Sequence, residues 1–166
     1  MAKAAAIEGI SADDGYGEVA ARVVSVRTRE LREQAEGVLD TADIERVHDM
    51  RVATRRLRAA VEVFEPCFPE KAFRQSLKEV KQLADGLGER RDRDVAIATL
   101  GGFSEQMPAP DRPGVVSLIS QLREEQEQAN RDLAPLVAAE RLAGITERLQ
   151  ELAASARGRA HREETE

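Results

Sequence analysis

Apolar residues recur at intervals of three and four along most of the chain, a spacing typical of helices that bury one face. The clearest row is Val47, Met50, Thr54, Leu57, Val61, Phe64 and Phe68. The pattern predicts helices at about residues 18–39, 44–64, 70–85, 92–100, 115–137 and 140–154. We therefore expect an all-α fold: a compact bundle of about six helices with a long C-terminal helix pair, which Pro135 kinks or restarts.

Glycine and proline residues separate the predicted helices. Gly86-Leu87-Gly88 is expected to end the third helix, and the prolines between Met107 and Gly114 to exclude regular structure. The expected organisation is a flexible leader at 1–16, one helical domain at 17–155 and a charged, frayed tail at 156–166. Within the domain, we expect a motif-bearing four-helix part at 17–103, a proline-rich linker at 104–114 and C-terminal helices at 115–155.

Composition agrees with a helical bundle and adds an asymmetry of charge. Charged residues make up 34% of the chain and aromatic residues 3%, a balance that favours helices packed on helices. The net charge of −6 alone argues against a polyanionic partner. Residues 46–93, however, hold 12 Lys and Arg against 8 Asp and Glu, whereas the remainder holds 13 against 23. A basic middle in an acidic chain is a hint of a charged partner.

The chain carries few signals of compartment. The single cysteine, Cys67, excludes an internal disulfide, and a reduced cytosol is the default for such a chain. The apolar run after Lys3 is too short and interrupted for a signal peptide. No apolar run approaches the roughly 20 residues that a membrane span needs. We expect a cytoplasmic protein without a membrane partner.

Two rows of basic residues are the main candidates for function. His48, Arg51, Arg55 and Arg58 are spaced 3-4-3 and share one face of the second predicted helix, beside its apolar row. Arg74, Lys78 and Lys81 are spaced 4-3 on the third helix. The short connection favours antiparallel packing of the two helices, which would place the rows side by side. Arginines one turn apart, about 5–6 Å, would grip an extended polyanion at successive charges.

Catalytic and metal-binding hypotheses find little support. Glu45-x-x-His48 has the spacing of a di-iron ligand pair, but the second such pair is missing. His48-Asp49 lacks the further histidines of a metal-dependent phosphohydrolase, and Cys67 lacks the context of a nucleophile. Asp92 and Asp94 are too few acids for a phosphoryl-transfer site. We expect no enzyme activity, no metal and no cofactor.

Other interpretations of the basic rows stay open at this point. In one of them, the charges pair with acids on neighbouring helices in a purely structural or scaffolding bundle. A nucleic-acid-binding helical module would use the same rows, although the scarcity of aromatic residues makes nucleic acid an unlikely partner, because stacking platforms for single strands are missing.

The sequence resembles the CHAD family, the conserved-histidine α-helical domains. The first match is His48-Asp49-Met50-Arg51-Val52-x-x-Arg55-Arg56-Leu57-Arg58. The second joins Leu77-Lys78 and Lys81-x-Leu83 to Leu87-Gly88-x-x-Arg91-Asp92-x-Asp94-Val95. The resemblance covers roughly residues 17–103 and implies an all-helical domain that binds inorganic polyphosphate without hydrolysing it. Relatives are associated with polyphosphate granules or with CYTH-type triphosphatase domains, which are the partners and location that the resemblance implies.

The resemblance also implies a set of polyphosphate-binding residues. These are His48, Arg51, Arg55, Arg56, Arg58, Lys78, Lys81 and Arg91. Arg74 joins them because it shares the row of Lys78. Arg56 lies about 100° from Arg55 on a helix, so its side chain is expected to diverge from the others.

The chain departs from the family pattern in three respects. CHAD domains are usually longer, with two similar bundles about a pseudo-twofold axis and a basic channel between them, and here one set of motifs is present. His161 lies in the charged tail and does not match a second motif, and Asp85 stands where a basic residue is common. A homodimer would restore a two-sided site, so we expect a homodimer as one form of the protein.

Overall fold

Five α-helices and two short 3₁₀ helices make up the described part of the chain. A computed structural model describes residues 3–163, with side chains to residue 158, and this part contains no strand. The α-helices are α1 (Tyr16–Glu33), α2 (Ile44–Val63), α3 (Glu70–Gln106), α4 (Arg112–Leu133) and α5 (Ala139–Glu163). The 3₁₀ helices are η1 (Glu65–Cys67) and η2 (Ala109–Asp111). The predicted all-α class is confirmed, with five helices in place of six.

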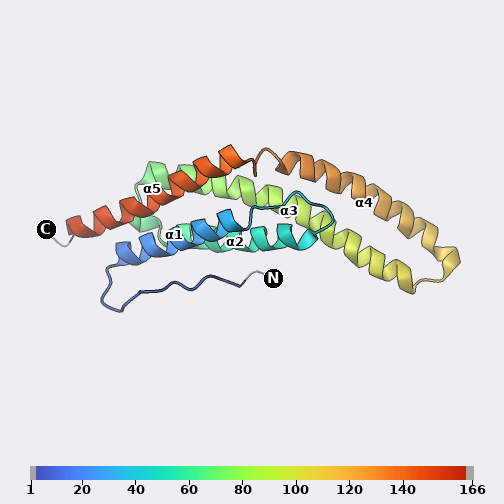
Figure 1. Cartoon of the computed structure of the whole chain (residues 1–166), viewed down its shortest axis with the longest axis horizontal. Coiled ribbons are helices and arrows are strands. Elements are labelled where there is room, and N and C mark those ends of the chain that lie inside the picture. Colours follow the sequence, from blue (N-terminus) through green and yellow to red (C-terminus); the bar gives the residue numbers. More distant parts are fainter. Residues whose placement is uncertain (1–2, 164–166) are drawn as a thin grey trace.

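The helices form two structural parts that share α3. Helices α1, α2, α5 and the first half of α3 lie side by side as a four-helix bundle (Figure 1). The end of α3 continues beyond this bundle beside α4, so that the two form a projecting hairpin (Figure 1). The chain then returns along the bundle as α5.

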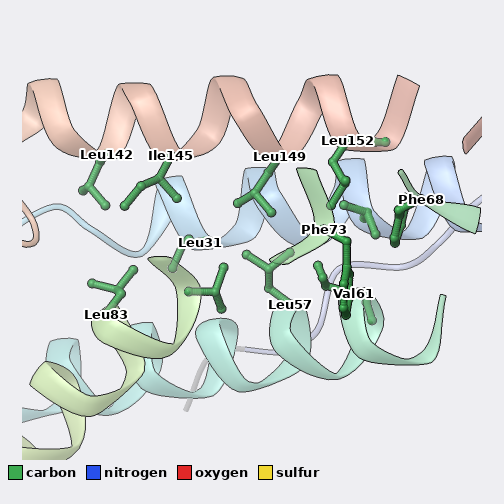
Figure 2. Close-up of a cluster of buried hydrophobic side chains, with 14 of the residues drawn as sticks. Leu31, Leu57, Val61, Phe68, Phe73, Leu83, Leu142, Ile145, Leu149 and Leu152 are labelled. Carbon is green, nitrogen blue, oxygen red and sulfur yellow. The ribbon is translucent and has the colours of Figure 1, made fainter. Parts of the chain in front are cut away.

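The core lies within the four-helix bundle. On α5, Leu142, Ile145, Leu149 and Leu152 follow a 3-4-3 spacing and are almost fully buried. Figure 2 shows them pointing toward leucines and phenylalanines of the other bundle helices, among them Leu57 and Phe73. Burial of such a side chain contributes about 1.5–3 kcal/mol, so this row holds α5 on the bundle. The periodicity in the sequence correctly placed this core.

The predicted break at Gly86-Leu87-Gly88 is wrong, because α3 runs through it without interruption. Leu87 is fully buried, and a side chain on Gly86 would approach Leu136 Cδ1 to 2.8 Å. Gly86 therefore allows close packing against the end of α4, and this packing outweighs the low helix propensity of glycine. Gly101 and Gly102 likewise lie within α3, so the third and fourth predicted helices are one.

Other boundaries also differ from the sequence-based expectation. Helix α1 ends at Glu33, and turns lead to Gly37, whose φ of 68° is in the left-handed region. The expected irregular linker is mostly helical, since η2 lies within it and Pro113 occupies the first turn of α4. Pro135 separates α4 from α5, which corresponds to a restart and not a kink.

The two ends of the chain pack on α1. In the leader, the Ala5 carbonyl accepts a 3.0 Å hydrogen bond from Arg27 Nη1. At the other end, α5 continues through the segment expected to fray, as far as Glu163, and Arg157 Nε lies 3.1 Å from Glu18 Oε2. The side chain of His161 lies outside the described residues.

An ion pair between α3 and α5 strengthens the bundle. Arg148 donates two hydrogen bonds to Glu79, from Nε to Oε2 at 2.8 Å and from Nη2 to Oε1 at 2.6 Å. The hydrogen bond to Glu79 raises the pKa of the Arg148 guanidinium above its ordinary value. A raised pKa on a base adds stability that is lost only as the pH rises through that pKa. The contribution of this pair is therefore constant around neutral pH.

Candidate functional site

A groove of about 570 Å³ lies between α2 and α3. We call it the α2/α3 groove, and its lining residues are Arg51, Arg55, Arg58, Ala84, Asp85, Gly88, Glu89 and Asp92. The two helices run antiparallel, because Lys81 lies near Glu62 at one end and Arg91 near Glu45 at the other. Gly88 leaves the α3 side open, since a Cβ there would meet no atom within 4 Å.

The three arginines enter the groove from one face of α2. Their 4-3 spacing places them next to the buried residues Met50 and Leu57, which fix the rotation of the helix. Arg58 Nε donates a 3.0 Å hydrogen bond to Glu62 Oε1 on the next turn. Arg51 and Arg55 form no ion pair or side-chain hydrogen bond with any residue whose side chain is described. Two guanidinium groups are thus available to an oxyanion at adjacent turns.

Carboxylates on α3 form the opposite side of the groove. Asp85, Glu89 and Asp92 are spaced 4-3 and all line it. Glu89 is engaged by Arg93 in an ion pair one turn away. Along α3, the basic row of Arg74, Lys78 and Lys81 is therefore followed by a row of acidic residues. The 4-3 spacing of these three acids in the sequence was the available signal for an acidic side of the groove.

The predicted basic row of α3, which is Arg74, Lys78 and Lys81, lies toward the Arg58 end of the groove. Lys81 Nζ is 3.9 Å from Glu62 Oε1, the oxygen that also accepts from Arg58, so the three side chains meet across α2 and α3. Lys78 is exposed, and Arg74 is highly exposed in an ion pair with Glu70. Such exposed pairs contribute little to stability, so Arg74 can exchange Glu70 for another anion.

His48 and Arg91 lie at the opposite end, beyond the lining residues. His48 is half-buried one turn before Arg51. Arg91 Nη1 donates a 3.1 Å hydrogen bond to the Ile44 carbonyl and lies 3.6 Å from Glu45 Oε1. Because these contacts occupy a largely buried guanidinium, Arg91 mainly ties α3 to the start of α2.

Arg56 is the predicted site residue that the fold directs away from the groove. Its Nη1 lies 3.8 Å from Glu30 Oε1 of α1, on another side of α2. The physical reason is the rotation of about 100° per residue along a helix, which separates Arg56 from Arg55. We therefore leave Arg56 out of the proposed binding surface.

A buried polar network, which the sequence analysis did not find, holds the base of the projecting hairpin. Arg90 and Asp94 are both fully buried, and Arg90 Nε donates to Asp94 Oδ1 at 2.9 Å. Gln126 Nε2 donates to the same oxygen at 2.6 Å. Asn130 accepts from Arg90 and donates a 2.9 Å hydrogen bond to the Leu39 carbonyl. The i, i+4 spacing of Arg90 and Asp94 was the available signal.

Neither a metal-ligand cluster nor a membrane-spanning helix is found among the described residues. No group of three or more His, Cys, Asp and Glu side chains among them is arranged to hold a metal ion. In the same part of the chain, every helix is too short or too polar to cross a bilayer.

The fold and the groove define a class: an all-α protein with an arginine-lined groove suited to oxyanions. A comparison with protein-family models matches the CHAD domain over residues 22–166, nearly the whole chain. The chain therefore belongs to the CHAD domain family, as the motifs around His48 and Arg91 indicated. No curated protein matches the chain in a sequence search.

Proposed function

We propose that this protein binds inorganic polyphosphate in the α2/α3 groove without hydrolysing it. The observation that carries the proposal is the pair Arg51 and Arg55, whose guanidinium groups lie one turn apart in the groove with no described carboxylate partner. Each planar guanidinium can donate two hydrogen bonds to a phosphate. CHAD domains are known in polyphosphate-related proteins, which supports this choice among polyanions.

Arg58 and Lys81 extend the proposed binding surface. Both contact Glu62, so a phosphate chain reaching this end would compete with a carboxylate for them. Lys78 and Arg74 continue the row on α3, and His48 lies at the other end of the α2 row. A chain lying along α2 would contact Arg51 and Arg55 first, because no described side chain occupies their donors.

The carboxylates of Asp85, Glu89 and Asp92 limit the proposed affinity. They face the arginines, so they oppose the approach of a polyanion to the α3 side. We infer that bound polyphosphate lies against α2 and away from the acidic stretch of α3. Cations that screen the carboxylates would strengthen binding.

The chemistry of the groove supports a binding role over a catalytic one. Its lining residues are arginines, carboxylates, Ala84 and Gly88, a set without a nucleophile beside a base. We propose a cytoplasmic protein that can associate with polyphosphate granules. In this proposed role, its protein partners would be CYTH-type triphosphatases and granule proteins.

The test is a calorimetric titration of the full chain with polyphosphates of several lengths. Arg51→Gln and Arg55→Gln should each weaken binding about tenfold, because each removes a charge-assisted contact of about 1.4 kcal/mol. Arg123→Gln on α4 is the matched control, since it removes the same charge from an exposed helix face outside the groove. Equal weakening by the control would mean that net charge, not the groove, governs binding.

Two further readouts separate the other candidate roles. Circular dichroism shows whether the variants keep their helices; loss of folding in both groove variants would favour a purely structural bundle. Competition with DNA at equal phosphate concentration and fixed salt tests whether the protein prefers polyphosphate to nucleic acid. If DNA displaces polyphosphate, the proposed specificity is wrong and a nucleic-acid module is favoured.

A further inference from the structure

The part of α3 and α4 that projects from the bundle has an unusual surface. We call residues 95–125 the distal hairpin: the end of α3, η2 and the beginning of α4, which lie together beyond the four-helix bundle (Figure 1). Its two helices are joined at the tip, where Arg112 Nε donates a 2.9 Å hydrogen bond to the Met107 carbonyl. The α2/α3 groove lies outside this segment.

The distal hairpin is uncharged all round over most of its length. Residues 95–104 on α3 and 113–122 on α4 contain no Asp, Glu, Lys or Arg, in a chain that is 34% charged. A helix that faces water on most sides normally carries charged residues there, and a helix without them is normally covered. Two such stretches lie opposite each other in one hairpin.

The hairpin buries its own apolar residues only in part. No side chain from residue 95 to residue 125 is fully buried. Four large apolar side chains are exposed, namely Val95, Phe103, Val116 and Leu118, at 45%, 56%, 55% and 45% of their surface. Two paired helices cover only one face of each other, so the remaining apolar surface meets water unless another element covers it.

The glycines of the hairpin leave its backbone accessible to a partner. A Cβ on Gly101, Gly102 or Gly114 would meet no atom within 4 Å, so packing inside the chain does not require glycine at these positions. Glycine inside a helix is less stable than alanine. By contrast, Gly86 in the same helix makes room for Leu136. Glycine at an exposed helix face allows another backbone to approach closely.

We propose that the distal hairpin is a homodimer interface, on which the distal hairpin of a second copy of this chain docks to form a four-helix bundle. An uncharged face needs an uncharged partner face, because desolvating unpaired charges against it is costly. The hairpin itself is such a face, and a twofold axis brings it against its own copy. The interface is independent of polyphosphate binding and leaves both α2/α3 grooves open.

Sedimentation velocity of the full chain in buffer without polyphosphate tests the interface. The wild-type protein should sediment as a concentration-dependent dimer. Val116→Glu should raise the dimer dissociation constant at least about tenfold, since it buries an unpaired charge in the interface. Val63→Glu is the matched control: Val63 is 63% exposed at the end of α2, outside the hairpin, so the dimer should persist.

Gly102→Ala provides a variant that is expected to fold well. Alanine favours the helix and meets no atom of its own chain, so melting should show a helix at least as stable as in the wild type. It should nevertheless weaken the dimer if another backbone approaches there. A wild-type protein that stays monomeric at its highest soluble concentration overturns the proposal, and so does a dimer that Val116→Glu leaves unchanged.

Discussion

At the residue scale, the neighbours of a guanidinium decide whether it is available to a ligand. Arg51 and Arg55 have no described partner, whereas Arg58 shares Glu62 with Lys81 and Arg91 is held by the Ile44 carbonyl. All four belong to the motifs that the sequence analysis singled out. The geometry ranks them, and it places the two unpaired arginines at the centre of the proposed site.

Asp85 offers a gain-of-binding test at this scale. Asp85→Asn should strengthen polyphosphate binding about three- to fivefold, because it removes one exposed negative charge worth about 0.7–1 kcal/mol facing the arginines. Calorimetric titration measures the change. Glu124→Gln, on the exposed face of α4, changes the net charge equally and should have a smaller effect. No gain from Asp85→Asn would place the bound chain outside the groove.

At the scale of an element, α3 connects the core, the proposed binding groove and the proposed dimer interface. Its first half forms one side of the core, its middle lines the groove, and its end builds the distal hairpin. The helix can do this only because it continues through Gly86 and Gly88. These two glycines have different roles, and substitutions at the two positions should change the stability in opposite directions.

Opposite changes in stability are expected at Gly86 and Gly88. Gly86→Val should lower the free energy of unfolding by about 1–3 kcal/mol, because its side chain would overlap Leu136 and Leu133. Gly88→Ala should raise it by about 0.5–1 kcal/mol, since the added methyl meets no atom and favours the helix. Urea denaturation followed by circular dichroism measures both. A stabilising Gly86→Val would contradict the close-packing role.

The buried pair of Arg90 and Asp94 controls how the hairpin joins the bundle. Asp94→Asn should cost about 3–5 kcal/mol, because it leaves the fully buried charge of Arg90 without its counterion. The double variant Arg90→Met/Asp94→Leu should recover much of this loss, since it removes both charges. Denaturant unfolding of Arg90→Met, Asp94→Leu and the double variant completes a double-mutant cycle. Additive losses would argue that the pair does not act as a unit.

At the scale of the whole molecule, an acidic protein presents the proposed binding residues as basic rows on α2 and α3. The net charge of −6 opposes a polyanion at long range, so the proposed binding depends on local contacts, above all those with α2. Each phosphate contact releases counterions from the ligand, which makes the affinity fall with salt.

The salt dependence of the affinity therefore reports how many phosphate contacts the protein makes. A plot of log affinity against log salt should have a negative slope, and replacing both Arg51 and Arg55 by Gln should make it shallower by about 1–2, since about 0.7 is lost per contact with a single strand. Titrations at several salt concentrations measure the slope. An unchanged slope would show that these arginines do not contact phosphate, whereas Arg123→Gln should leave the slope as it is.

The core was more predictable than the site. Periodicity identified the buried rows of α2 and α5, because a 3-4 spacing maps directly onto one helix face. It placed Arg51, Arg55 and Arg58 together for the same reason. It did not reveal that α3 passes through two glycines, because local propensity gives no measure of the packing of Gly86 against Leu136.

The sequence by itself determined the all-α class, the residues that face the core and the spacing of the basic rows. These follow from the local geometry of a helix, which each stretch of sequence carries within itself. The tertiary structure decided which charges meet. It paired Arg56 with Glu30, set Asp85 across from the arginines and left the distal hairpin uncovered, because such contacts join segments far apart in the chain.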